Sequence, residues 1–182
     1  MTDLYAVLPD GVDDLGRPSG GNVYDRRAIR GQEALGRRVV ELPVPGAWPT
    51  PDADDLERLD ASLATVPDGG VVVVDGLVAS GAAAVLPRHA SRLRVVVLLH
   101  MPIGPDRGEE LVLESAAAVV TTSAWSRGRV RGWYGLSHVD VALPGVDPVD
   151  AAPPHRTAAG GTSFLCVAAV HPGKGHDLLF DA

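Results

Sequence analysis

Short aliphatic runs alternate with helix-forming stretches along most of the chain, and this alternation restricts the fold more than any other sequence feature. Six runs rich in Val and Leu predict strands at Leu4–Leu8, Arg38–Leu42, Val71–Asp75, Leu93–Leu99, Ala118–Thr121 and Val139–Leu143. The stretches between them predict helices at Val23–Leu35, Ala53–Ala64, Val78–Leu86, Glu109–Ala116 and Ser126–Tyr134, with caps at Asn22, Asp52 and Ser123. Strands that are separated by helices pair in parallel, so the sequence predicts an α/β fold with a doubly wound parallel sheet.

The composition fits a sheet that is covered by helices. Hydrophobic residues make up 46% of the chain but aromatic residues only 4%, so the interior is expected to consist of Val, Leu and Ala. With 182 residues the chain has room for one complete core and at most a fragment of a second domain.

Charge and cysteine content exclude several classes of protein. A net charge of −7 argues against a nucleic-acid partner, because binding to phosphates depends on clusters of basic residues. Cys166 is the only cysteine, so no internal disulfide can form, and the N-terminus has no signal-peptide pattern. The longest apolar run, Val95–Leu99, is too short to span a bilayer. We therefore expect a soluble, cytoplasmic protein whose partners are small molecules or proteins.

The composition changes after the segment from Pro144 to Pro148, which indicates a domain boundary. Residues 150–161 are rich in Ala, Pro and Gly, as in an exposed linker. We expect a first domain at residues 1–148, a linker at 149–161 and the start of a second domain at 162–182. The second part predicts a strand at Ser163–Val170 with Cys166 in its core, then a helix near His176 that is still short at Ala182. We therefore expect the natural product to continue, and a fragment with this unpaired strand to self-associate through residues 163–170.

Two glycines precede the first predicted helix. The loop from Pro9 to Asn22 ends in Ser19-Gly20-Gly21-Asn22, and free N–H groups at a helix start favour a phosphate or an acceptor hydroxyl. The alternative is that the glycines serve only a loop and a helix cap. The loop contains no GxGxxG motif, although Glu41 stands where the ribose-binding acid of a dinucleotide site would be.

Two titratable residues end predicted central strands. His100 follows the fourth strand and Asp75 ends the third, at the carboxyl edge where open α/β sheets bind ligands. An imidazole there could hydrogen-bond a sugar hydroxyl or transfer a proton, and the carboxylate could accept from a hydroxyl. The alternatives are a structural histidine and an aspartate that opens a turn.

Lys174 is the only lysine of the chain and stands between two glycines just before a helix. Such a site suits a diphosphate, because the backbone can approach and the ammonium supplies charge. A solvated loop lysine is the alternative. Three arginines, Arg127, Arg129 and Arg131, lie close to Trp125 and Trp133. A solvated helix face is the favoured interpretation of this run, and peripheral contact with a membrane is the alternative. No metal-ligand spacing or nucleophile motif occurs, so we expect no metal site.

Five elements, taken in order, resemble glycosyltransferase family 4 over nearly the whole chain. They are Ser19-Gly20-Gly21-Asn22, Leu99-His100-Met101-Pro102, the segment from Thr122 to Ser126, the segment from Leu143 to Asp147, and the segment from Val167 to Asp177. The last two are the most specific, because a Pro-Gly-Val-Asp hinge is followed about 25 residues later by a Lys-Gly-His-Asp helix start.

The resemblance implies the GT-B fold, in which two Rossmann-like domains face a cleft and this chain supplies the acceptor-side domain. It also implies a retaining transfer from a nucleoside-diphosphate sugar to an acceptor without a metal or other cofactor. By the same resemblance, His100 would be catalytic and Gly21 and Lys174 would bind the donor. From their positions we expect Gly20 to bind the donor as well, and Asn22 and Asp75 to bind the acceptor. The fragment alone is expected to be inactive.

The sequence departs from the family pattern near the lysine. Many members carry Gly-Arg where this chain has Ala168-Ala169, so the usual arginine contact to the diphosphate is missing. Two other classes of function remain as alternatives. One is another nucleotide-binding enzyme, such as a sugar-nucleotide epimerase or an NAD-dependent oxidoreductase, and the other is a non-catalytic binding module.

Overall fold

A computed structural model describes residues 3–16, 18–150, 165–168, 170 and 174–181. Contacts within the chain divide it into two units, Met1–Pro144 and Gly145–Ala182, and each is described by itself. The predicted boundary at residue 148 lies close to this division, whereas the predicted linker falls mostly outside the described residues.

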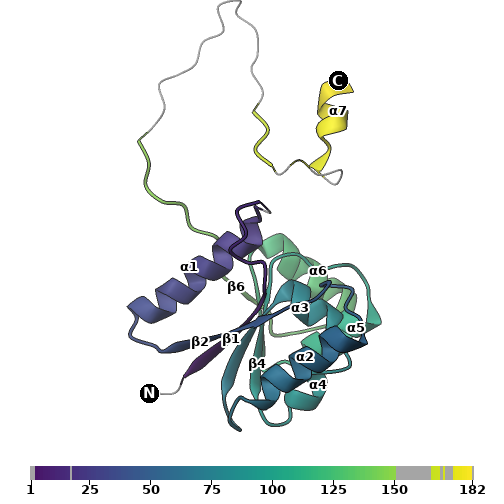
Figure 1. The fold of residues 1–182 in the computed structure, drawn as a ribbon. Coiled ribbons are helices and arrows are strands. Elements are labelled where there is room, and N and C mark those ends of the chain that lie inside the picture. The colour runs from purple at the N-terminus through teal and green to yellow at the C-terminus, as the bar shows by residue number, and fades with distance from the viewer. Residues whose placement is uncertain (1–2, 17, 151–164, 169, 171–173, 182) are drawn as a thin grey trace, which may run out of the picture. The chain divides into compact units, whose positions relative to one another are not determined.

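The first unit is built on one sheet of six parallel strands (Figure 1). They are β1 (Leu4–Pro9), β2 (Val39–Val44), β3 (Val71–Asp75), β4 (Arg94–Leu99), β5 (Ala118–Thr121) and β6 (Asp140–Val141). The spatial order β2-β1-β3-β4-β5-β6 reverses its direction at β1, because the chain moves outward to β2 and then returns to the other side. This Rossmann-like, doubly wound arrangement confirms the predicted fold class, and ligands bind such sheets at the carboxyl ends of the strands near the reversal.

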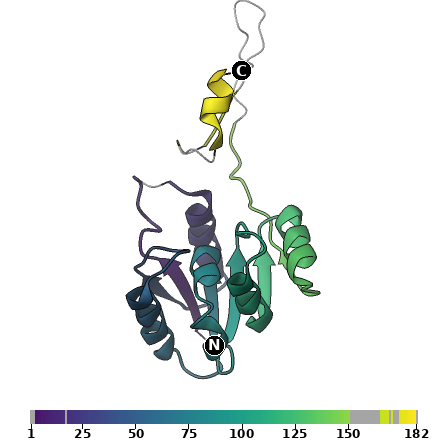
Figure 2. The same cartoon turned by 90° about the vertical axis from the view of Figure 1, so that its right-hand side faces the viewer.

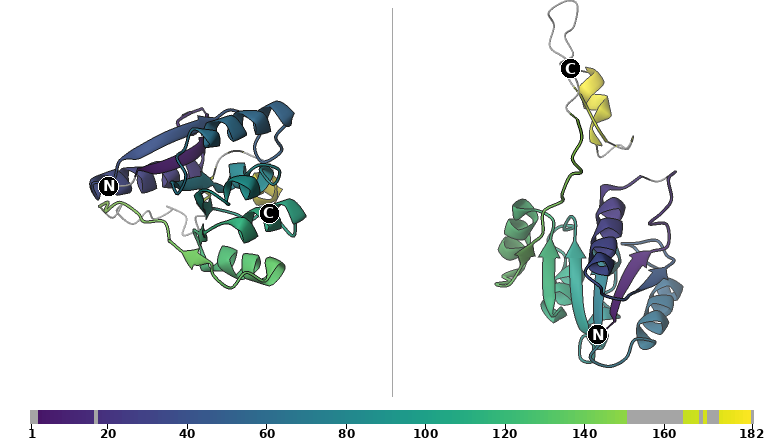
Figure 3. Two further views of the ribbon diagram at one scale, coloured as in Figure 1. Left: turned by 90° about the horizontal axis from the view of Figure 1, so that it is seen from below. Right: turned by 90° about the vertical axis from the view of Figure 1, so that its left-hand side faces the viewer.

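Helices cover the two faces of the sheet unequally. The long helix α1 (Gly20–Ala34) lies on one face, and α2 (Ala53–Ala64), α3 (Gly76–Gly81), α4 (Leu86–His89) and α5 (Arg107–Ser115) lie on the other (Figures 1 and 2). The sixth helix, α6 (Ala124–Tyr134), packs beside β5 and β6. The right panel of Figure 3 shows α1 in front of the sheet, with the β4 and β5 side lacking a helix on that face.

The alternation of side chains along each strand produces two separate cores. On β3, Val72 and Val74 are fully buried in the large core with Leu59 and Leu63 of α2, because successive side chains point to opposite faces. On the α1 face Val71 and Val73 are only half-buried, and the small core there consists of Ala6, Leu8, Val12 and Ile29. The sheet is therefore well sealed on one face and partly open on the other.

Several helix boundaries differ from the sequence prediction for local reasons. The cap of α1 is Ser19, whose hydroxyl accepts from the N–H of Asn22, so the helix begins at Gly20 rather than at Val23. The helix predicted at 78–86 is two short helices, because Asp75 caps α3 and the chain turns again before α4. The caps at Asp52 and Ser123 are confirmed.

In the second unit the structure describes one helix, α7 (His176–Asp181). The strand predicted at residues 163–170 is wrong for the residues described there, since 165–168 and 170 have no strand structure and Cys166 is exposed. A single strand is not stable without a partner, and no described residue pairs with this segment. Self-association through residues 163–170 stays a prediction.

Candidate functional site

The candidate site lies at the carboxyl edge of the sheet, near the point where the strand order reverses. Asp75 is the last residue of β3 and His100 follows β4 directly, whereas Gly21, Tyr24 and Asp25 come from the first turns of α1. Gly21 and Asp25 are four residues apart and share one face of the helix, which is the face toward His100. Three elements that are distant in the sequence meet here.

Two buried carboxylates flank one nitrogen of the imidazole. Nε2 of His100 lies 2.8 Å from Oδ1 of Asp25 and 3.6 Å from Oδ2 of Asp75. The two aspartate side chains are 2% and 4% exposed, whereas that of His100 is 20% exposed. The ring also meets the edge of the Tyr24 ring, with centroids 5.3 Å apart at an interplanar angle of 74°. His100 is therefore held on several sides and still reaches the surface.

The cluster has more acceptors than donors. The backbone N–H of Leu77, at the start of α3, donates to Oδ1 of Asp75 at 2.9 Å, so the other oxygen of Asp75 is the one near His100. Oδ2 of Asp25 is buried and has no hydrogen-bond partner. A buried polar atom in this condition typically costs about 1–3 kcal/mol of stability.

Burial and mutual repulsion shift the pKa values of the cluster. Burial, followed by the charge of Asp25, raises the pKa of Asp75 to about 6. Burial alone would lower the pKa of His100, but the hydrogen bond to Asp25 and the charges of both aspartates outweigh it and raise that pKa. Nε2 of His100 makes the contact with Asp25, and among the described residues Nδ1 has no hydrogen-bond partner. The imidazolium form would therefore offer Nδ1–H to a ligand.

Gly21 of α1 lies close against the ring of His100. A Cβ atom at Gly21 would lie 3.1 Å from Cδ2 of the imidazole, which is tighter than nearly all real contacts of this kind. A Cβ atom at the neighbouring Gly20 would meet nothing within 4 Å. Only the second glycine is therefore needed for the contact between the helix and the histidine.

Hydrogen bonds from other motif elements fix the backbone on both sides of the site. The hydroxyl of Thr122 donates to the carbonyl oxygen of His100 at 3.2 Å, and that of Ser126 lies 3.5 Å from the same oxygen. On the other side the hydroxyl of Tyr24 donates to the carbonyl of Ala142 at 2.9 Å, just before Leu143. Three of the five elements that carry the family resemblance thus meet at one edge of the sheet, and Ala142 directly precedes the fourth.

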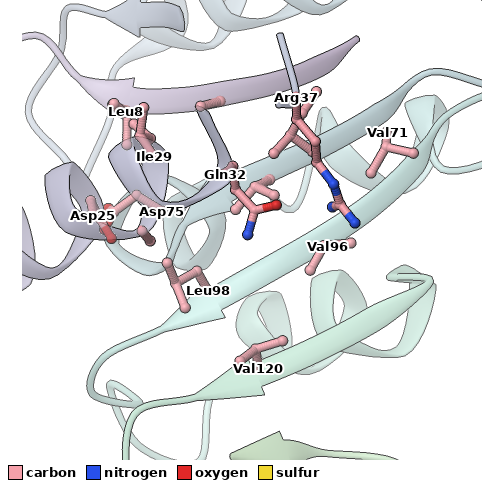
Figure 4. A pocket seen from close by; sticks show the side chains of 14 residues that line it. Leu8, Asp25, Ile29, Gln32, Arg37, Val71, Asp75, Val96, Leu98 and Val120 are labelled. Atoms are coloured by element: carbon pink, nitrogen blue, oxygen red, sulfur yellow. The ribbon is translucent and has the colours of Figure 1, made fainter. Parts of the chain in front are cut away.

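A groove of about 280 Å³ runs from this cluster along the open face of the sheet (Figure 4). Asp25 and Asp75 lie beside each other at one end of it, and Gln32 and Arg37 line it farther along. Its floor consists of aliphatic strand residues, including Val71, Val96, Leu98 and Val120. Oε1 of Gln32 is another buried atom without a hydrogen-bond partner. The groove thus combines an apolar floor with unsatisfied polar groups.

The structure brings together three of the six residues that the sequence predicts for the site: Gly21, Asp75 and His100. Gly20 opens α1 without such a contact, and Asn22 lines a different groove together with Arg26, Arg27 and Arg30. Lys174 is exposed and belongs to the second unit, so its role stays a prediction.

The sequence analysis missed Asp25 and Tyr24. An aspartate at a buried position of a helix is itself a signal, because charged residues are rarely buried without a partner. The metal prediction considered only short ligand spacings, whereas ligand atoms of Asp25, Asp75 and His100 all lie within 4.8 Å of one another.

Glu41, the acid that a dinucleotide site would use to bind the ribose, already pairs with an arginine. Glu41 lies within β2, where Arg26 contacts it at 2.6 Å. The guanidinium of Arg26 also pairs with Asp13 of the loop after β1. Glu41 therefore holds that loop and α1 to the sheet.

No helix among the described residues is both long and apolar enough to cross a membrane. No family model matches this chain, and no curated protein matches it. Function is therefore inferred from the geometry of the sheet edge and from the motif elements that meet there.

Proposed function

We propose that this chain is the acceptor-side half of a retaining glycosyltransferase, which moves a sugar from a nucleoside-diphosphate sugar to an acceptor. The observation that supports this best is the convergence on His100. Gly21 leaves room for its ring, Thr122 donates to its carbonyl, and Tyr24 joins the same helix turn to Ala142, just before the Pro-Gly-Val-Asp hinge. Elements that resemble glycosyltransferase family 4 in sequence therefore also form one site in space.

In this proposal His100 binds a neutral sugar hydroxyl rather than a phosphate. Two carboxylates stand behind the imidazole, so the cluster carries no net positive charge even when His100 is protonated and both aspartates are ionised. A phosphate would be repelled, whereas a hydroxyl can accept from Nδ1–H. The negative cluster also favours the positive charge that develops on the sugar ring in an oxocarbenium-like transition state.

The diphosphate is assigned to two other groups. The start of α1 at Gly20 and Gly21 offers free backbone N–H groups and the positive end of a helix of 15 residues. Lys174 supplies a cation that neutralises the departing diphosphate. In the same proposal Asp75 and Asn22 stand on the acceptor side. The dinucleotide alternative has less support, because Glu41 already forms an ion pair with Arg26.

The proposal is tested with the full-length protein. Release of nucleoside diphosphate is measured against a panel of nucleotide sugars, with water taking the sugar in a slow hydrolysis, so that the natural acceptor need not be known. We expect His100→Ala to lower kcat/KM about 100- to 1,000-fold, as for the loss of a hydrogen bond to the transition state. His138→Ala, at an exposed position of the first unit, is the control and should stay within about twofold of wild type. Release from no member of the panel, or equal activity of the two variants, would contradict the proposal.

The same assay tests the cation of the second unit. Lys174→Ala should lower kcat more than donor affinity, because the charge of the leaving diphosphate grows in the transition state. The expected loss is about 30- to 1,000-fold, since Ala169 supplies no second cation. A kcat/KM within about threefold of wild type would leave Lys174 as a solvated loop residue.

A further inference from the structure

We propose that Asp25, Asp75 and His100 form a binding site for one divalent transition-metal ion, with Zn²⁺ as the best-fitting case. One imidazole nitrogen and two carboxylates are a donor set that zinc accepts, and a fourth position stays available for water. The inference does not rest on the proposed function, because the ion would tie α1 to the ends of β3 and β4. While it is bound, Asp75 and Nε2 of His100 are occupied and the cluster is neutral, so the proposed transfer uses the metal-free chain.

The distances among the ligand atoms suit such an ion. Zinc binds nitrogen and carboxylate oxygen at about 2.0–2.2 Å, which places neighbouring ligand atoms about 3.0–3.6 Å apart. Nε2 of His100 is already 3.6 Å from Oδ2 of Asp75, and it is 2.8 Å from Oδ1 of Asp25. The second pair must therefore open by only a few tenths of an ångström.

A second observation points to a ligand in this cluster. Oδ2 of Asp25 is buried without a hydrogen-bond partner, on a residue that is 2% exposed. It belongs to the carboxylate whose Oδ1 contacts His100, and ligand atoms of Asp25 and Asp75 lie within 4.8 Å of each other. A buried oxygen with no donor needs a cation or a proton, and a divalent ion would neutralise both carboxylates at once.

The surroundings hold the ligand atoms in position. The N–H group of Leu77 fixes Oδ1 of Asp75, so that only Oδ2 is left for an ion. The edge of the Tyr24 ring limits the rotation of the imidazole. An ion on Nε2 would leave the proton on Nδ1, which is the nitrogen that the proposed transferase uses.

The site is tested by calorimetry: the chain is first freed of metal with a chelator and is then titrated with Zn²⁺. Every chain carries Cys166→Ser, because the exposed thiol is itself a zinc ligand. We expect one equivalent of Zn²⁺ to bind, and Asp25→Asn, Asp75→Asn and His100→Gln each to weaken it at least about 10- to 100-fold. Asp60→Asn is the matched control, since its carboxylate also pairs with a histidine, His89, at 2.8 Å but should not affect zinc binding.

A measurement on the Cys166→Ser chain keeps the test decisive if a ligand variant folds poorly. The imidazole NMR signals of His100 should shift on addition of Zn²⁺ and return with chelator, whereas those of His89 should not. Absence of zinc binding, zinc binding that leaves the His100 signals unchanged, or ligand variants that bind zinc as tightly as the Cys166→Ser chain would overturn the proposal. Each of these results would mean that protonation, and not a metal ion, compensates the charge of the two buried carboxylates.

Discussion

Asp55 and Asp75 are both buried carboxylates at 4% exposure, but their surroundings treat the negative charge in opposite ways. The N–H groups of Ala47 and Asp52 donate to Oδ2 of Asp55 at 3.0 and 3.2 Å, and Arg58 pairs with its other oxygen. These donors, first of all the N–H of Ala47, hold the pKa of Asp55 below its usual value. Burial raises the pKa of Asp75 to about 6, and the nearest charged neighbour that adds to this is another carboxylate.

The difference separates a carboxylate that stabilises the fold from carboxylates that lower its stability. Around Asp55 the loop before α2 and the helix start collect donors for one acceptor. At the sheet edge α1 and β3 bring two carboxylates to one imidazole and leave Oδ2 of Asp25 unsatisfied. Strongly perturbed, crowded groups at a ligand-binding edge are typical of functional sites.

Asp55→Ala should have the largest effect on stability. It deprives the N–H groups of Ala47 and Asp52 of their acceptor and should lower Tm at pH 7 by about 5 °C or more. Because the pKa of Asp55 is depressed on folding, its contribution is present above its ordinary value of 3.8 and is lost as the pH falls through the folded value. The difference in Tm from wild type, measured by circular dichroism, should therefore shrink at acid pH. An undiminished difference at pH 3 would show that packing, not charge, is responsible.

Asp75→Asn should act in the opposite direction. The folded pKa of about 6 lies above the ordinary 3.8, so this group contributes stability below pH 4 that is lost as the pH rises through 6. Removing the ionisable group should stabilise the chelator-treated protein by about 1–3 kcal/mol at pH 8 and by almost nothing at pH 4. The asparagine oxygen can still accept from the N–H of Leu77. Urea unfolding at the two pH values measures this, and a variant less stable than wild type at pH 8 would contradict the comparison.

Gly21→Ala should have the smallest effect on stability and a local effect on the site. Alanine favours the helix, but its Cβ presses on Cδ2 of His100, so the net change should stay within about 1 kcal/mol. The imidazole signals of His100 and the ring signals of Tyr24 should shift in NMR spectra. Gly20→Ala is the matched control, since a Cβ there meets nothing within 4 Å. Equal spectra for the two variants would show that the helix start does not position the histidine.

The sequence predicted the sheet well because its signal is local. Valine-rich runs separated by helical stretches are enough for the strands and their parallel pairing, and Asp75 and His100 could be placed because they end such runs. Asp52 and Ser123 were identified as caps for the same reason.

Asp25 could not be placed in this way, because its role depends on packing between distant elements. Asp25 faces His100 because α1 begins at Gly20 and packs over the part of the sheet that contains β1 and β3. The segment at residues 165–168 shows the opposite limit. Its composition favours a strand, but a strand forms only with a neighbour to pair with, and sequence pattern does not supply one.

The most direct test of the central claim, that Asp25 and Asp75 favour the protonated form of His100 and raise its pKa, is the pKa of the His100 imidazole. NMR titration of the chelator-treated chain should place it above the ordinary 6.5. Asp25→Asn should lower it, because both the hydrogen bond and the charge of Asp25 are lost, whereas Asp60→Asn should leave it unchanged. A His100 pKa at or below 6.5 that does not respond to Asp25→Asn would contradict the account.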